Sequence, residues 1–316
     1  MTKSQEKSIE SRDLLIIGSG PAGLSAAIYA ARAELKPLLL TGMTLHGQVS
    51  ATDVIENYPG FPDGIGGSEL GQLFQIQAER FGAEIVMDQV TSVNLSKNPF
   101  TIETYGKKYQ VKALIISTGA DHRKLGVPGE QSLTGRGVSY CGTCDGWFFK
   151  DKDIVVVGGG DSALEEGLFL TRFANSVTVI HRRDELRAGA ILQKRAFDNP
   201  KIKFIWDSVV TEIIGEDSVK AVRLKNVKTG DVNVHKTEGV FTFIGHTPNS
   251  ELFKEHLELD DKGYLAVNKN METNLPGVYA AGEVADPDFR QVITSAGMGA
   301  AAAIQATRYF ESLEED

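Results

Sequence analysis

The chain has 316 residues, 41% of them hydrophobic, and its 33 basic against 42 acidic side chains leave a net charge of −9. This length suits two domains of ordinary size, and the negative charge argues against nucleic acid or an anionic membrane as the main partner. No apolar stretch approaches the roughly 20 residues of a membrane-spanning helix, and residues 1–12 are too polar for a secretory signal. We therefore expect a soluble, cytoplasmic protein.

The first functional signature follows a short apolar run at residues 14–17. Gly18-Ser19-Gly20-Pro21-Ala22-Gly23 then opens an Ala-rich helix pattern that extends to residue 32. Between a strand and a helix, such glycines permit a tight turn and a close backbone approach, and the helix N-terminus attracts a pyrophosphate. The pattern predicts a dinucleotide site. The next strand, predicted over residues 37–40, ends in Thr41-Gly42 rather than in the acid that usually holds an adenosine ribose.

Loops are predicted around residues 58–67, a helix over 69–81, and a strand over 113–116 that ends at Ser117-Thr118-Gly119. A similar strand end occurs at Gly245, and a further apolar strand ends near residue 282. We infer that residues 120–246 form one domain inserted into another, which consists of residues 1–119 and 247–316. The two crossings are expected to act as hinges.

The only two cysteines are Cys141 and Cys144, and the acid Asp145 follows directly. A dithiol closed through two small residues can cycle between disulfide and thiol states, and a structural disulfide is unusual in a reducing cytosol. No second cysteine pair or suitably spaced histidine completes a metal site, so none is expected. Asp145 is either a proton donor to a leaving thiolate or a helix-capping or loop carboxylate. The aromatic run at 147–149 is expected to pack around the loop.

The second signature repeats the first. A strand over 154–157 leads into Gly158-Gly159-Gly160-Asp161-Ser162-Ala163, a helix pattern to residue 172 and a strand over 176–180. That strand ends in His181-Arg182-Arg183, with Arg187 four residues on. Several cations there favour a 2′-phosphate, which arginine holds through paired, charge-assisted hydrogen bonds. This predicts NADPH rather than NADH; a solvated basic surface is the alternative.

Near the C-terminus, Gly297-Met298-Gly299 is expected to open an Ala-rich helix over residues 300–309. Small residues at a helix start let the backbone approach a flat ring, and the N-terminus stabilises negative charge on a reduced flavin. A tightly packed Ala-rich helix without a ligand fits the pattern equally well.

Together, these residues resemble the low-molecular-weight, bacterial-type thioredoxin reductases, which contain FAD and depend on NADPH. The likeness runs from about residue 13 to the last helix. Its motifs are Gly18 to Gly23, Thr41-Gly42-Met43, Gly47-Gln48, Glu56-Asn57-Tyr58-Pro59-Gly60, Gly135 to Ser139, Cys141 to Gly146, Gly158 to Ala163, His181-Arg182-Arg183 with Arg187, Gly245 to Asn249, and Arg290 to Gly297.

The resemblance implies an α/β fold of two Rossmann-like domains of the three-layer ββα type, with the NADPH-binding domain inserted into the FAD-binding domain. It implies FAD contacts at Gly18, Gly20, Ala22, Gly23, Thr41, Gly42, Gly47, Gln48, Asn57, Gly282, Glu283, Arg290, Gln291 and Val292. It implies NADPH contacts at Gly160, Asp161, Ser162, Ala163, His181, Arg182, Arg183 and Arg187. Cys144 would be the cysteine nearest the flavin, Asp145 the proton donor, and the protein a homodimer.

Two positions depart from the family pattern. Glu283 stands where an aspartate is usual, so its carboxylate is one methylene further from the backbone. His46 stands where a small residue is usual, close to the expected pyrophosphate.

We therefore expect a thioredoxin-disulfide reductase in which NADPH reduces FAD, the flavin reduces the Cys141–Cys144 disulfide, and the dithiol reduces thioredoxin. Because one loop cannot face both a buried flavin and a protein partner, the inserted domain is expected to rotate between two states. A flavin-dependent dithiol oxidase, a ferredoxin-linked thioredoxin reductase and a non-catalytic redox sensor are the alternatives. His181, Arg182, Arg183 and Arg187 argue against the oxidase and the ferredoxin-linked enzyme, because neither binds a nicotinamide nucleotide.

Overall fold

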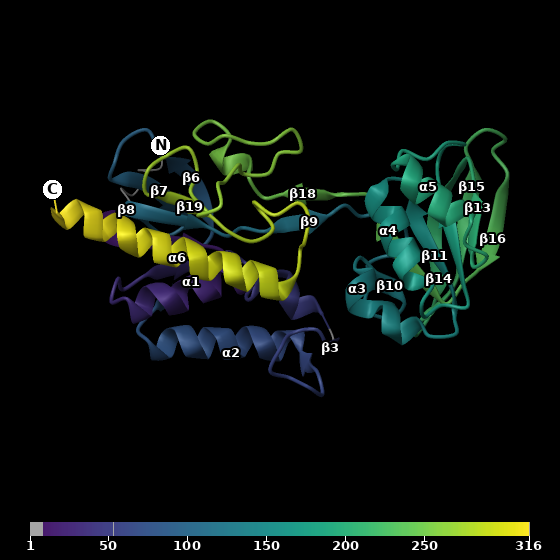
Figure 1. Ribbon diagram of the computed structural model, residues 1–316, viewed down its shortest axis with the longest axis horizontal. Coiled ribbons are helices and arrows are strands. Elements are labelled where there is room, and N and C mark those ends of the chain that lie inside the picture. The colour runs from purple at the N-terminus through teal and green to yellow at the C-terminus, as the bar shows by residue number, and fades with distance from the viewer. Residues whose placement is uncertain (1–8, 53, 316) are drawn as a thin grey trace, which may run out of the picture. The chain divides into compact units, whose positions relative to one another are not determined.

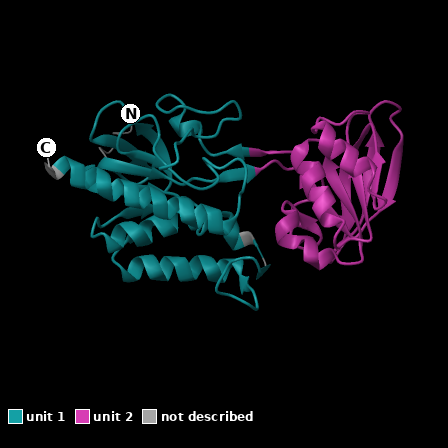
Figure 2. Cartoon of the chain, viewed as in Figure 1, with its two compact units in different colours: residues 1–121, 247–316 teal, residues 122–246 magenta. Residues whose placement is uncertain are grey.

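The computed structural model describes residues 9–52 and 54–315. Residues 1–8, part of the polar segment that argued against a secretory signal, lie outside the described residues. The chain forms two compact units, unit 1 from Met1–Asp121 and Thr247–Asp316 and unit 2 from His122–His246 (Figure 2). Unit 2 is thus an insertion, and the chain crosses after residues 121 and 246, where residues 119 and 246 were predicted.

Unit 1 is built on a seven-stranded sheet with the strand order β5-β2-β1-β8-β7-β6, in which β19 also pairs with β8 (Figure 1). Its elements are β1 (Ile9–Ile17), α1 (Pro21–Arg32), β2 (Leu38–Leu40), the 3-10 helix η1 (Gly47–Ala51), β3 (Val54–Ile55), β4 (Ile65–Gly66), α2 (Gly67–Arg80), β5 (Glu84–Val86), β6 (Val90–Asn94), β7 (Phe100–Thr104), β8 (Lys108–Ile116), η3 (Glu251–Phe253), β19 (Val278–Ala280) and α6 (Val292–Glu315).

The sheet of unit 1 is buried on both faces. Strand β1 pairs in parallel with β2 and β8, and its last four residues are all buried. Leu14 and Ile16 belong to the core formed with α1 and α6, whereas Leu15 and Ile17 belong to the core on the opposite face. Because successive side chains of a strand alternate between faces, a continuous apolar run is what a doubly covered parallel sheet requires.

Helix α6 begins at Val292, so the predicted helix start near Gly297 is wrong. Figure 1 shows α6 lying along α1, and Gly299 explains how closely they approach: a Cβ at this position would lie 1.9 Å from the carbonyl oxygen of Ala22. Glycine has a low intrinsic helix propensity. Packing against α1 therefore stabilises the helix at Gly297 and Gly299, where the local sequence disfavours it. Within residues 9–52 and 54–315, no helix is both long and apolar enough to cross a membrane.

Unit 2 has three layers. A parallel sheet with the order β10-β17-β11-β12-β13 lies between helices and an antiparallel sheet, β14-β15-β16. Val156 of β11 packs with the helices, while Val155 and Val157 pack with the antiparallel sheet. The elements are β10 (Val138–Ser139), α3 (Gly142–Asp145), η2 (Gly146–Phe149), β11 (Asp153–Gly158), α4 (Asp161–Leu170), β12 (Ser176–Ile180), α5 (Ala190–Phe197), β13 (Ile202–Ile205), β14 (Ser208–Gly215), β15 (Val219–Asn226), β16 (Val232–Lys236) and β17 (Gly239–Phe243).

The connecting segments β9 (Ala120–His122) and β18 (His246–Pro248) pair in a two-stranded sheet. Within unit 2, the Nδ1 of His122 lies 2.6 Å from the Nε2 of His246. The backbone has a positive φ at Gly119 (71°) and at Gly245 (108°), a conformation that favours glycine. The role of these two glycines as hinges stays a prediction.

The close packing of α6 on α1 predicts a large difference between two glycines of the same helix. Gly299→Ala should destabilise the protein by about 1–3 kcal/mol, because the new methyl group must push the helices apart. Gly297→Ala is the matched control, since a Cβ there would meet nothing within 4 Å, and it should cause no loss. Thermal unfolding of the FAD-free variants measures both. Equal midpoints for the two variants would contradict the packing account.

Candidate functional site

Cys141 and Cys144 form a disulfide in unit 2, directly after strand β10. Cys141 caps the start of α3, and its Sγ accepts a hydrogen bond from the backbone N–H of Cys144 at 3.2 Å. Both cysteines are half-buried. A sulfur that accepts a backbone N–H at a helix start is stabilised as a thiolate once the disulfide is reduced.

Asp145 is held by a residue that the sequence analysis did not assign, Ser139 of β10. The Ser139 hydroxyl donates to Oδ2 of Asp145 at 2.5 Å and accepts the backbone N–H of Cys141 at 3.1 Å. Asp145 precedes η2, but its side chain does not cap that helix. The capping alternative is therefore wrong, and the carboxylate is fixed beside the cysteine pair by a buried hydroxyl.

The aromatic run after the disulfide divides into exposed and buried side chains. Phe149 is buried and its ring lies 4.8 Å from that of Phe241, as the expected packing role requires. Trp147 is 54% exposed, yet its ring packs edge-on against that of Phe173, with the centroids 5.9 Å apart, whereas Phe148 is 44% exposed. Because a 3-10 helix turns by a third of a circle at each residue, only one of three consecutive rings faces the core.

In unit 2, the glycine turn and the basic segment come together. A Cβ on Gly158 would lie 2.5 Å from the carbonyl oxygen of Phe243, and one on Gly159 would lie 2.3 Å from Nδ1 of His181. The backbone N–H of Arg187 donates to the carbonyl of Gly159 at 2.7 Å. Asp161, Ser162 and Ala163 form the first turn of α4 beyond Gly160. The two separate stretches predicted to bind NADPH therefore lie in contact with each other.

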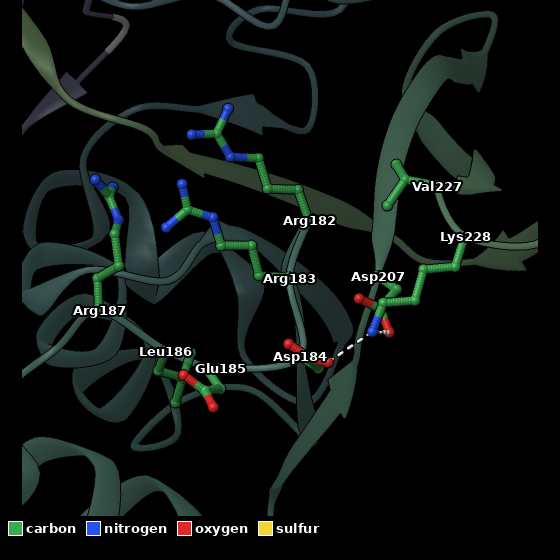
Figure 3. Close-up of a pocket in the computed structure, with 9 residues that line it drawn as sticks. All are labelled: Arg182, Arg183, Asp184, Glu185, Leu186, Arg187, Asp207, Val227 and Lys228. Atoms are coloured by element: carbon green, nitrogen blue, oxygen red, sulfur yellow. Dashed lines mark hydrogen bonds and ion pairs between the residues drawn. The ribbon is translucent and has the colours of Figure 1, made fainter.

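Arg182, Arg183 and Arg187 line a pocket of about 290 Å³. In Figure 3 their guanidinium groups extend to the same side of the view. The other lining residues are Asp184, Glu185, Leu186, Asp207, Val227 and Lys228. The last three come from the antiparallel layer and the segment before it, and no local motif predicts them.

His181, which directly precedes these arginines, is buried. Its Nε2 has no hydrogen-bond partner among the described residues. Burial lowers the pKa of His181 against the opposing backbone hydrogen bond at Glu185, and the charges of Arg187 and Arg183 lower it further, which favours the neutral ring at pH 7. The buried, unpartnered nitrogen is a polar group to which a ligand could supply the missing hydrogen bond.

In the glycine turn of unit 1, Gly18 and Gly23 have no space for a side chain, whereas Gly20, which directly precedes α1, does. A Cβ on Gly18 would lie 2.3 Å from the carbonyl oxygen of Ser117, and one on Gly23 would lie 1.8 Å from that of Gly18. By contrast, a Cβ on Gly20 would meet nothing within 4 Å. Gly20 is the N-cap of α1 and offers no side chain to its first amides. These amides are the groups that bind phosphate at helix N-termini.

Several predicted FAD residues gather at this turn. A Cβ on Gly47 would lie 3.2 Å from Cα of Gly20, and one on Gly282 would lie 2.9 Å from Cβ of Ala22. Thr41 and Gly42 follow β2, whose last residue is level with the end of β1. The carboxyl ends of neighbouring parallel strands thus bring these residues to one edge of the sheet.

Four of the remaining predicted FAD residues pair with each other, Gln48 with Glu283 and Asn57 with Gln291. Nε2 of Gln48 donates to the carbonyl of Ala120 and lies 3.5 Å from Oε2 of Glu283. Nδ2 of Asn57 donates to Oε1 of Gln291 at 3.1 Å. Arg290 precedes this glutamine, and Val292 is the first residue of α6. Residues far apart in sequence are thereby paired within unit 1.

His46 turns its ring away from the glycine turn. Its Nε2 lies 2.8 Å from Oε1 of Gln75 on α2, while its backbone N–H donates to Oγ of Ser19 at 3.0 Å. The ring also fills the space beside Gly71, where a Cβ would lie 2.5 Å from Cβ of His46. The side chain therefore anchors this loop to α2, and only its backbone reaches the turn.

Glu283 is half-buried, and its burial raises the pKa to about 7, against the opposing effect of Arg290. The folded protein then keeps a proton that the unfolded chain releases near pH 4.5. Stability of the FAD-free protein should therefore fall as the pH rises from about 4.5 to 7 and change no further through this group above pH 7.

Replacing this carboxyl group tests that assignment. Glu283→Gln should leave the thermal midpoint of the FAD-free protein unchanged near pH 5 and raise it by roughly 2–4 °C near pH 8. Glu258→Gln is the control, because Glu258 is an exposed glutamate of the same unit. A difference between variant and wild type that is the same at both pH values would exclude a raised pKa.

Comparisons with known proteins agree with this geometry. Residues 12–303 match the family model of the pyridine nucleotide-disulphide oxidoreductases. Thioredoxin reductase from Streptomyces coelicolor is 52% identical over 308 residues, 96% of each chain. The enzyme of that name from Rickettsia typhi is 51% identical over 301 residues, 94% of this chain and 97% of the relative. The crystal structure of thioredoxin reductase from Streptococcus pyogenes has a TM-score of 0.90 at 47% identity, covering 96% of this chain and 99% of that one.

These likenesses confirm the predicted α/β class with two dinucleotide-binding domains, and they do not favour the oxidase or ferredoxin-linked alternatives. The chain belongs to the thioredoxin reductases of the pyridine nucleotide-disulphide oxidoreductase family.

Proposed function

We propose that this protein uses NADPH and FAD to reduce the disulfide of a thioredoxin through its own Cys141–Cys144 pair. One observation carries the proposal. The disulfide adjoins an acid held in place by Ser139, and it belongs to the same unit as a glycine turn joined to a pocket of three arginines. Membership of the thioredoxin reductases supports the choice of protein substrate.

The residues of unit 1 fit FAD. The amides at the start of α1, beside the open position of Gly20, suit a pyrophosphate, and Gly47 and Gly282 pack their segments closely against this turn. We assign FAD contacts to these residues and to Thr41, Gln48, Asn57, Glu283, Arg290, Gln291 and Val292. The raised pKa of Glu283 makes its carboxyl group a hydrogen-bond donor near pH 7, which suits a hydroxyl-bearing chain.

The residues of unit 2 fit NADPH. Gly160, Asp161, Ser162 and Ala163 start α4, where a pyrophosphate would bind. Arg182, Arg183 and Arg187 face the same pocket and suit a 2′-phosphate, which NADH lacks. The unpartnered Nε2 of His181 is a further polar group available to the ligand.

When bound, the two cofactors supply the two electrons that convert the disulfide to a dithiol. The Cys141 thiolate, which accepts the N–H of Cys144, then attacks one sulfur of the thioredoxin disulfide and forms a mixed disulfide. Cys144 gives its thiol proton to Asp145 and attacks the Sγ of Cys141, which restores the Cys141–Cys144 disulfide and releases thioredoxin. Asp145 passes that proton to one leaving thioredoxin thiolate, and the other takes a proton from solvent in place of the one that Cys141 released on forming its thiolate. The exchange thus transfers two electrons, and thioredoxin leaves as a dithiol.

This exchange sets a thermodynamic requirement. Thioredoxin has a potential near about −270 mV, and each ~30 mV of mismatch costs about 1.4 kcal/mol for a two-electron couple. The potential of the Cys141–Cys144 pair should therefore lie close to that of thioredoxin.

Exposed Trp147 and Phe148 beside the disulfide support a macromolecular substrate, because adjoining apolar side chains on a surface commonly mark a partner site. The same short loop must also be reduced within the protein. We therefore propose that unit 2 rotates at the crossings near Gly119 and Gly245 between two states. We also propose a homodimer, as the family resemblance implies, and a cytoplasmic location.

The relay through the cysteine pair is tested by Cys144→Ser. The variant should keep its yellow flavin but lose thioredoxin reduction by at least about 10³-fold, because no dithiol can form. NADPH oxidation with ferricyanide, which bypasses the disulfide, serves as the internal control and should persist. Thioredoxin reduction at the wild-type rate would refute the relay.

The cofactor preference is tested by replacing Arg182 and Arg183 together with alanine. Loss of two charge-assisted contacts should raise the Michaelis constant for NADPH by about 10–100-fold and leave that for NADH nearly unchanged. Arg195→Ala, an exposed arginine of α5 that does not line the pocket, is the control. An equal loss with both nucleotides would remove the 2′-phosphate from the assignment.

A further inference from the structure

Lys228 lies outside the basic segment, yet it lines the same pocket. It follows β15 on the turn that leads to β16, whereas Arg182, Arg183 and Arg187 follow β12. Figure 3 shows its side chain reaching back toward the basic segment from the opposite side of the pocket. The three arginines line the pocket from the parallel layer. The antiparallel layer therefore supplies Lys228 as a fourth cation.

The ammonium group of Lys228 lies between two carboxylates. Its Nζ is 2.6 Å from Oδ2 of Asp184 and 3.1 Å from Oδ2 of Asp207. The hydrogen bond from Lys228 lowers the pKa of Asp184, and the two carboxylates raise the pKa of Lys228. Lys228 is therefore the cation that pairs with both acids.

Backbone contacts join these acids to the basic segment. Asp184 belongs to that segment itself, while the N–H of Asp207 donates to the carbonyl of Arg183 at 3.3 Å. The N–H of Val227 in turn donates to the carbonyl of Asp207 at 2.6 Å. The two carboxylates consequently cannot move far from the arginines, and their charge must be balanced where they stand.

The charge of the pocket depends on this balance. Four cations, the three arginines and Lys228, face three carboxylates, Asp184, Glu185 and Asp207. Without Lys228 the numbers are equal, and two carboxylates are left to repel a phosphate or to pair with the guanidinium groups. All these groups line one pocket, within the distance over which physiological salt screens charges only in part. In Figure 3 the guanidinium groups point away from the lysine, which leaves them available.

We propose that Lys228 is a positioning residue that sets the preference for a 2′-phosphorylated nucleotide by neutralising Asp184 and Asp207 beside the arginines. The proposal rests on the assignment of this pocket to NADPH. Lys228 acts on the phosphate through the carboxylates and not as a ligand. Its loss should weaken binding of a 2′-phosphorylated nucleotide and leave a nucleotide without that phosphate unaffected.

Calorimetric titration of the FAD-loaded, oxidised protein with adenosine 2′,5′-bisphosphate and with adenosine 5′-monophosphate tests this. Lys228→Met should weaken the bisphosphate about tenfold and leave the monophosphate unchanged. Lys225→Met is the matched control, because it removes the same charge from an exposed position on β15 that does not line the pocket. Lys228→Arg, which keeps the positive charge, should bind both nucleotides as the wild type does.

A combined variant separates neutralisation from direct contact. Adding Asp184→Asn and Asp207→Asn to Lys228→Met should recover the affinity for the bisphosphate that Lys228→Met loses, since no carboxylate then needs a partner. Asparagine also tolerates the positive φ of 49° at residue 207. Continued weak binding in this triple variant would overturn the proposal in favour of a direct phosphate ligand.

Two further outcomes are decisive. If Lys228→Met weakens both nucleotides equally, or matches Lys225→Met, the proposed role is wrong. If the wild-type protein itself shows no preference for the bisphosphate, the NADPH assignment of the pocket fails, and the inference that rests on it fails with it.

Discussion

The close approach of backbone to backbone at two glycine turns is the constraint on which both candidate cofactor sites depend. At Gly23 in unit 1, a Cβ would lie 1.8 Å from the carbonyl oxygen of Gly18, and at Gly158 in unit 2, one would lie 2.5 Å from that of Phe243. Each approach seats the first turn of a helix, α1 or α4, at the carboxyl end of a parallel sheet. Side chains from neighbouring strand ends then converge on helix amides that receive no side-chain cap from Gly20 or Gly160.

The residues assigned to the proposed reaction are distributed unequally between the two units. Unit 1 holds the residues assigned to FAD, whereas unit 2 holds both the residues assigned to NADPH and the disulfide. The proposed reaction therefore requires the units to cooperate, and the paired segments β9 and β18 are where the chain passes between them. Charge is handled locally within each site, by burial of Glu283 in one and by balanced cations and carboxylates in the other.

The sequence patterns predicted those features whose residues are contiguous along the chain. Both glycine turns, the cysteine pair and the basic segment are contiguous in sequence, so their chemistry is visible there. The start of α6 was wrong because packing of Gly299 on Ala22 stabilises helix where glycine disfavours it. Ser139 was missed although it lies only two and six residues from its partners Cys141 and Asp145, because a serine at that spacing is not a distinctive pattern. Lys228 was missed because Asp184 and Asp207 lie on other segments, so that no residue spacing reveals the contacts.

The central claim is an electron path that begins at NADPH and ends at thioredoxin, and anaerobic titration of the yellow protein tests it most directly. Flavin absorbance would be followed during addition of NADPH and, separately, of NADH, before oxidised thioredoxin is added. The account predicts rapid bleaching by NADPH, little by NADH, and recovery of the absorbance on adding thioredoxin. A flavin that neither nucleotide bleaches, or that thioredoxin does not reoxidise, would contradict it.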